Sequence, residues 1–197
     1  MGVHNIKLYG FPVTATVVDD CSLADSGIIQ LMNQLCELKI VGIDVKGTEL
    51  SAEPQLLLIY VKDRCLIIQL GRMSSYPSQL ASFLGDTNIC FVGANMNRKA
   101  DVLKKSWIPL VWKGSPMMHR VEVGELAARV LKNADLEKCD NLEELAKKSG
   151  FDFKEADEKK RPTPNWAAVC LSEEEVKCAM REVFISYNVA SKLLSQL

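Results

Sequence analysis

The first residue that suggests chemistry is Asp44, which ends a hydrophobic run in the segment VGIDVK at 41–46. A carboxylate at the end of a buried strand is costly unless it binds a partner. In an enzyme the partner is a metal ion or a substrate. In a structural role it is a basic side chain or a helix terminus, and taken alone Asp44 fits the structural role better.

A second segment, FVGANMNRKADVL at 91–103, is typical of a strand that leads into a helix. Gly93 lies just past the strand, where the absence of a side chain permits close approach of another backbone. An ordinary strand-to-helix connection has the same pattern, so this segment indicates a function only in combination with the segments at 41–46 and 165–184.

A third segment, NWAAVCLSEEEVKCAMREVF at 165–184, begins the last predicted helix. Ser172 and Glu175 have the spacing of a capping box, which marks a helix start. Cys178 and Glu182 are four residues apart, so they share one face of that helix. A solvated charge on the helix surface is the alternative role for Glu182.

Hydrophobic periodicity predicts the elements that must position these side chains. Apolar runs predict two strands within 5–18, a tight hairpin at 62–64, and strands at 39–45, 55–61, 64–70 and 88–94. A period near 3.6 predicts helices at 25–37, after Asp20 or Ser22, and at 77–85, 97–106, 121–132, 141–149 and from Ser172 onward. The charged stretch 150–165 is predicted to be a loop. This order of elements favours a mixed sheet flanked by helices.

Composition places the chain among globular proteins. Its 197 residues, 48% hydrophobic and 25% charged, predict a single α/β domain over 1–197. The net charge of −1 excludes a strongly basic whole-chain surface, so any nucleic-acid contact must be local. No apolar run approaches the roughly 20 residues of a membrane span, and no signal-peptide core is present, so no membrane partner is expected.

The seven cysteines favour a reducing compartment. Their number is odd and no pair has CxxC spacing, which predicts reduced, buried thiols in a cytoplasmic or nuclear protein. The histidines, His4 and His119, stand alone, so a zinc site is not expected.

Read together and in order, the three segments resemble the motifs of DnaQ-like 3′-to-5′ exonuclease domains of the RNase D and Werner-syndrome helicase type. The resemblance covers about residues 12–195. It implies an RNase H-like fold, with a mixed β-sheet flanked by α-helices. The small plant stand-alone branch is the most similar, on the phrases RCLIIQL and FVGA. That branch includes RISC-interacting clearing exoribonucleases, which form homohexameric rings.

The resemblance implies two-metal hydrolysis of phosphodiester bonds. Such sites use four carboxylates to hold two divalent ions about 3.5–4 Å apart, and Mg²⁺ or Mn²⁺ is the expected cofactor. At the matched positions the chain keeps two carboxylates, Asp44 and Glu182, which are the candidate catalytic and metal-binding residues.

The other matched positions depart from the family pattern. The first motif should read Asp-x-Glu, but Lys46 stands in place of the glutamate. The second should carry an aspartate where Lys99 falls, and Asp101 lies two positions along, about 200° away around a helix. Cys178 replaces the tyrosine of the third motif.

These departures change the charge of the site. Two carboxylates and two lysines sum to about zero, where the family pattern gives −4, so the site has little reason to concentrate two divalent ions. We expect the ammonium groups of Lys46 and Lys99 to stand in for metal charge. They would pair with Asp44 and Glu182 or meet a phosphate directly.

Three readings remain open. The chain is a 3′-to-5′ exonuclease acting on single-stranded RNA or DNA with Mg²⁺ or Mn²⁺, with a neighbouring subunit supplying missing groups. Alternatively, it is a catalytically silent relative that needs no cofactor and binds nucleic acid or a protein. A third reading is a subunit that only builds a ring with active paralogues. The resemblance implies a homo-oligomer, a hexameric ring, with RNA-silencing proteins as partners.

Basic side chains outside the matched positions are candidate phosphate contacts. Arg98, Lys104 and Lys105 lie on the helix after the second motif, and phosphate binding there would weaken with salt. A solvated basic helix face is the alternative for each. A second basic cluster, at 159–161, is largely offset by neighbouring acidic residues.

Overall fold

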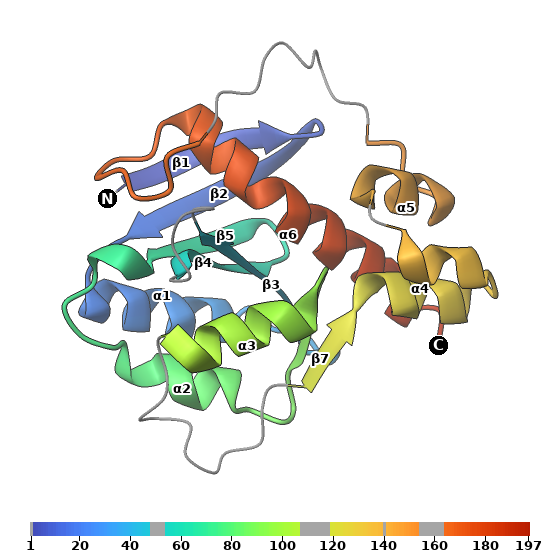
Figure 1. Cartoon of the computed structure of the whole chain (residues 1–197), viewed down its shortest axis with the longest axis horizontal. Coiled ribbons are helices and arrows are strands. Elements are labelled where there is room, and N and C mark those ends of the chain that lie inside the picture. The colour runs from blue at the N-terminus through green and yellow to red at the C-terminus, as the bar shows by residue number, and fades with distance from the viewer. Residues whose placement is uncertain (1, 48–53, 107–118, 140, 154–163) are drawn as a thin grey trace.

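The computed structural model describes residues 2–47, 54–106, 119–139, 141–153 and 164–197. Its strands form one mixed seven-stranded sheet in the order β1-β2-β5-β4-β3-β6-β7 (Figure 1). The strands are β1 (Gly2–Leu8), β2 (Phe11–Val18), β3 (Ile40–Gly47), β4 (Pro54–Val61), β5 (Arg64–Gln69), β6 (Cys90–Gly93) and β7 (His119–Glu122).

Helices cover both faces of the sheet. They are α1 (Cys21–Met32), α2 (Ser78–Leu84), α3 (Met96–Ser106), α4 (Val123–Val130), α5 (Leu142–Lys148) and α6 (Glu173–Leu194), with short 3₁₀ turns η1 (Leu70–Arg72) and η2 (Ala134–Lys138). One hydrophobic core joins the sheet to α4, α5 and α6, and a second joins the opposite face to α1, α2 and α3 (Figure 1). The predicted mixed sheet flanked by helices is confirmed.

Strand pairing brings the candidate segments to one edge of the sheet. β3 pairs with β4 antiparallel and with β6 parallel, and β6 pairs with β7 parallel. The carboxyl ends of β3, β6 and β7 therefore meet at the same edge. β3 and β4 are buried on both faces, which explains why their sequences are continuous apolar runs instead of alternating ones.

The structure corrects two element boundaries. The helix predicted at 25–37 is α1, which begins at Cys21 because the Asp20 carboxylate accepts hydrogen bonds from the N–H groups of Ser22 and Leu23. It ends at Met32, five residues before the predicted end, and Leu38 beyond it is exposed. The helix predicted from 121 begins two residues later, since those two residues end β7, an edge strand that the sequence pattern did not reveal.

The turn chemistry and the cysteines are partly as predicted. The predicted hairpin joins β4 to β5, and Lys62 adopts a positive φ of 57° in its turn. All seven cysteines are free thiols. The expectation that they are buried is wrong for most, because Cys65 is buried, Cys36 and Cys170 are exposed, and the other four are intermediate.

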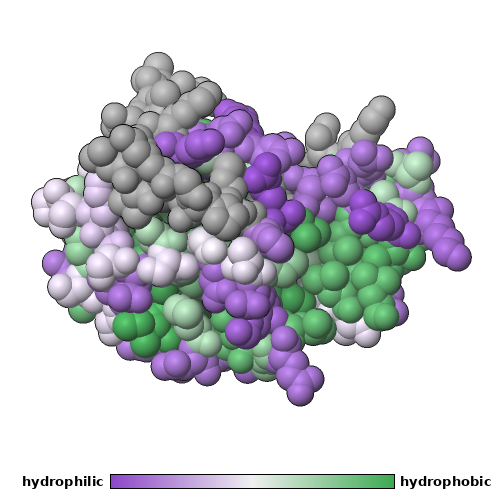
Figure 2. Space-filling model, turned by 90° about the horizontal axis from the view of Figure 1, so that it is seen from below, coloured by the Kyte–Doolittle hydropathy of each residue, from purple (hydrophilic) through white to green (hydrophobic). Residues whose placement is uncertain are grey.

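The surface mixes hydrophilic and hydrophobic areas. Seen from below, a hydrophobic area lies on the side of the molecule that carries α4 and the C-terminus (Figure 2). None of the helices in the described ranges combines the length and the apolar character needed to cross a membrane. Most of the predicted loop at 150–165 falls outside those ranges, as do the basic residues at 159–161.

Candidate functional site

The site is built on β3, a central strand of the sheet. Side chains two residues apart on a strand point to the same face, so Asp44 and Lys46 project together. Asp44 lies opposite Leu58 of β4, which belongs to the core beneath α6. Asp44 and Lys46 therefore face α6, at the carboxyl end of β3.

Helix α6 packs closely over this part of β3. A Cβ atom added to Gly42 would lie 3.0 Å from Val183 Cγ2 and 3.1 Å from Tyr187 Cβ, so the strand and the helix approach more closely than a larger residue would allow. Glu182 precedes Val183 on the helix. The glycine thus brings the Glu182 carboxylate within reach of Asp44 and Lys46.

Helix α3 supplies the fourth member of the site. Its first turn contains no acidic residue, and the Glu122 carboxylate from β7 instead accepts the N–H groups of Asn95 and Met96 at 3.0 and 2.8 Å. Gly93 allows the chain to pass close to β3, because a Cβ there would lie 2.7 Å from the Ile43 carbonyl oxygen. The contacts of Glu122 and this close approach together place the start of α3 beside the carboxyl end of β3.

The four side chains form one ion-pair cluster. Lys46 Nζ lies 2.8 Å from Asp44 Oδ2 and 2.9 Å from Glu182 Oε1. Lys99 Nζ lies 2.6 Å from Asp44 Oδ1 and 3.6 Å from Glu182 Oε2. Each ammonium group therefore bridges both carboxylates, and each carboxylate touches both lysines. We refer to Asp44, Lys46, Lys99 and Glu182 as the Asp44 cluster.

Burial differs across the Asp44 cluster. The Asp44 side chain is 1% exposed, Lys99 is 12% exposed and Lys46 is 14% exposed, whereas Glu182 is 49% exposed. Asp44 Oδ1 also accepts the N–H of Val45 at 2.7 Å. The aspartate is thus the buried centre of the cluster and the glutamate is its open side.

Electrostatics favours the charged forms within this cluster. Burial alone would raise the pKa of Asp44, but the charges of Lys46 and Lys99 outweigh it and hold that pKa below its ordinary value. Burial alone would lower the pKa of Lys46, but Asp44 and Glu182 together raise it. The cluster therefore contains an ionised aspartate and a firmly protonated Lys46 at neutral pH.

The geometry does not fit a pair of divalent ions. The positions where metal ions would meet the Asp44 carboxylate hold two ammonium groups, and the formal charge of the four side chains is zero. Across the residues that the structure describes, no three His, Cys, Asp or Glu side chains gather as a metal site. Hard divalent ions need an excess of negative oxygen ligands, and this cluster lacks it.

Comparison with known proteins places the fold. The exonuclease domain of EXD2 soaked in Mg and dGMP aligns with a TM-score of 0.53 and 22% identity, over 92% of this chain and 89% of that one. The same domain soaked in Mn aligns with a TM-score of 0.53 and 24% identity over the same shares. The chain has the RNase H-like fold of an exonuclease domain. No protein-family model and no curated protein matches it.

Other residues predicted from the sequence lie outside the Asp44 cluster. Arg98 and Lys104 are exposed on α3, as expected for a basic helix face, and the Lys105 side chain lies outside the described part of the chain. Asp101 is exposed and does not replace Lys99. Cys178 is half-buried, one helical turn before Glu182.

Sequence reasoning missed Glu122, which fixes the start of α3. A signal for it existed, since the N-terminal N–H groups of a helix need acceptors and the first turn of α3 offers no acidic side chain. Finding the acceptor required knowing that β7 lies beside β6. The hydrogen bonds from Asn95 and Met96 to Glu122 span 27 and 26 positions of the sequence.

Proposed function

We propose that this chain is a 3′-to-5′ exonuclease-like protein that binds single-stranded nucleic-acid ends and does not hydrolyse them by the two-metal route. The observation that carries the proposal is the pair of ammonium groups, Lys46 Nζ and Lys99 Nζ, at 2.8 and 2.6 Å from the oxygens of Asp44. A cation covalently tied to the protein neutralises the carboxylate, but it cannot activate a water molecule as a bound metal ion does.

Binding is favoured over a purely structural role by the neutral charge of the cluster and by exposed basic side chains on α3. A site with four carboxylates repels phosphate until metals bind, whereas a neutral site does not. Arg98 and Lys104 are exposed on α3, the helix that carries Lys99, and supply positive charge for a phosphate backbone. We take the whole chain, 1–197, as one exonuclease-like domain that presents this surface.

A labelled-strand assay tests the proposal. Single-stranded RNA and DNA carrying a 3′ label are incubated with the protein in EDTA, in Mg²⁺ and in Mn²⁺. We expect a shifted complex in all three conditions and no ladder of shortened products. Arg98→Ala combined with Lys104→Ala should weaken binding and reduce its salt dependence, with a slope lower by about one per phosphate contact.

The matched control is Lys7→Ala combined with Lys39→Ala, which removes two exposed positive charges outside α3. It should leave both affinity and salt slope close to those of the unmodified protein. A ladder that appears with Mn²⁺ and disappears in Asp44→Ala would overturn the silent reading. Absence of any complex with RNA or DNA would overturn the binding function.

Hydrolysis remains the second candidate, because the similar EXD2 exonuclease domain structures were soaked in Mg or Mn with dGMP or GMP. Mg²⁺ or Mn²⁺ would then be the cofactor, and a neighbouring subunit would have to supply carboxylates. This candidate requires an oligomer, such as the hexameric ring implied by the sequence resemblance. Mass measurement in solution tests that requirement, since a monomer with nuclease activity would exclude completion by a neighbour.

A further inference from the structure

A cavity of about 330 Å³ opens beside the start of α3, the helix that carries Lys99 of the Asp44 cluster. The turn before α3 and the first turn of α3 form one wall, and the β7–α4 junction, η2 and α5 form the others. Its volume lies at the small end of the range of about 300–1,000 Å³ for small-molecule sites. One compact ligand unit fits there, and a nucleic-acid duplex does not.

The walls of this cavity differ in character. Val123, Leu142 and Leu145 contribute an apolar side, and Leu145 is fully buried. Asn97 and Arg98 contribute an exposed polar side. An apolar surface opposite amide and guanidinium groups suits a nucleobase, whose flat face is apolar and whose edge carries donors and acceptors.

The cavity and the Asp44 cluster are joined by consecutive residues. Arg98 lines the cavity, and Lys99, the next residue on α3, belongs to the cluster. Both features lie at the carboxyl ends of the parallel strands β3, β6 and β7, the edge where open α/β sheets bind ligands. A strand whose phosphate meets the cluster would therefore have its adjoining nucleoside within reach of the cavity.

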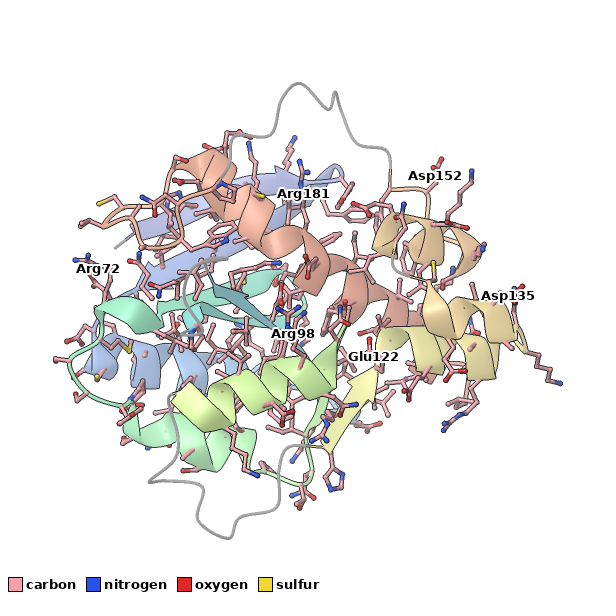
Figure 3. All side chains as sticks on the ribbon, viewed as in Figure 1. Arg72, Arg98, Glu122, Asp135, Asp152 and Arg181 are labelled. Atoms are coloured by element: carbon pink, nitrogen blue, oxygen red, sulfur yellow. The ribbon has the colours of Figure 1, made fainter. Side chains whose placement is uncertain are left out.

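Charge around the cavity favours a nucleoside over a free anion. Glu122 lies at the cavity, but both of its carboxylate oxygens already accept N–H groups at the start of α3. That helix start is thus capped by the protein itself and does not attract a phosphate. Arg98 and Glu122, both labelled in Figure 3, line the cavity with opposite charges, and the exposed Glu137 adds a second acidic group.

We propose that this cavity receives one nucleoside of a single strand held at the Asp44 cluster, an assignment that rests on the proposed nucleic-acid binding. The base packs over Leu142, the least buried of these apolar side chains, with Leu145 beneath it, and Asn97 and Arg98 contact its edge. The sugar–phosphate side faces the cluster. The chemical class of ligand is a single-stranded ribo- or deoxyribonucleotide with an unpaired base.

Methyl NMR on leucine- and valine-labelled protein tests the assignment directly. A single-stranded RNA hexamer and its DNA counterpart are titrated while the methyl signals of Leu142, Leu145 and Val183 are followed. Val183 adjoins Glu182 and reports on the cluster. We expect all three residues to shift, with the same midpoint as fluorescence anisotropy of the labelled hexamer.

The second measurement is the affinity of a variant whose cavity is filled by a larger side chain. Cys139 is half-buried and lines the cavity, so Cys139→Phe should occupy it and weaken hexamer binding about tenfold, the effect of losing one bound base. The matched control, Cys36→Phe, makes the same change at an exposed position outside the cavity and should bind normally.

The outcomes separate the two proposals. A hexamer that binds and shifts Val183, but leaves Leu142 and Leu145 unchanged, overturns the cavity assignment and leaves the proposed function intact. A hexamer that does not bind in anisotropy overturns the proposed function itself. Should Cys139→Phe fail to fold, the methyl titration of the unmodified protein still decides between these outcomes.

Discussion

Exchanging both lysines of the Asp44 cluster for acids, Lys46→Glu together with Lys99→Asp, should make the stability of the protein depend on metal. The formal charge of the four side chains falls from zero to −4. Asp44 is fully buried and loses both of its cationic partners. Removing one partner of a buried ion pair costs about 3–5 kcal/mol, so we expect at least that loss in the free energy of unfolding in EDTA.

Divalent ions should restore much of this loss. Four carboxylates would then meet at one place, which is the ligand set that Mg²⁺ and Mn²⁺ prefer. A ligand that binds only the folded state at 100 times its dissociation constant adds about 2.7 kcal/mol of stability. The unmodified protein should show no comparable gain, because Lys46 and Lys99 already neutralise the carboxylates.

Urea unfolding followed by circular dichroism measures the effect, in EDTA and with increasing MnCl₂. The control variant, Lys7→Glu with Lys39→Asp, makes the same change in net charge at exposed positions. The reasoning fails if the cluster variant is as stable in EDTA as this control, or if Mn²⁺ stabilises both equally. If the double variant is unfolded in EDTA, folding on addition of Mn²⁺ becomes the readout.

Three further predictions follow from single contacts. Two positively charged partners outweigh burial and lower the pKa of Asp44 below 3.8. The stabilising contribution of the Asp44 carboxylate is therefore present above that pH and is lost as the pH falls through the folded-state pKa. Acid unfolding should be steeper in the unmodified protein than in Asp44→Asn. Gly42→Ala should cost about 1–3 kcal/mol in urea unfolding because its Cβ would press on Val183, whereas Gly2→Ala, whose nearest contact is 3.5 Å away, should cost far less. Ser172→Ala should cost about 1 kcal/mol by removing a side-chain acceptor at the start of α6, and an unchanged unfolding midpoint would contradict this role.

Most of the fold could be predicted from the sequence because its elements carry local signals. The buried strands β3, β4 and β5 are continuous apolar runs, and the capping box at Ser172 marks the first residues of α6. β7 could not be predicted in this way, because it has four residues, its first two are exposed, and it runs directly into α4. Its identity as a strand depends on pairing with β6, which is a long-range contact.

The sequence could predict which residues form the Asp44 cluster, but not the ion pairs between them. Matched motif positions named Asp44, Lys46, Lys99 and Glu182, and the structure brings all four together. The sequence is compatible with two roles for the lysines, pairing with the carboxylates or meeting a phosphate, and the structure contains the pairing. Sequence spacing could not reveal this, because the mutual distances depend on how closely α6 approaches β3 at Gly42.

The pairing also gives a physical reason for lysine, and not a neutral residue, at both position 46 and position 99. A fully buried aspartate without a cation would be destabilising, and one lysine beside Asp44 and Glu182 would still leave a net charge of −1. The second lysine neutralises that remainder and occupies the other oxygen of Asp44, at 2.6 Å. The two lysines therefore depend on each other, and the four side chains should behave as one unit. The free-energy costs of Lys46→Met and Lys99→Met should not add when the two changes are combined.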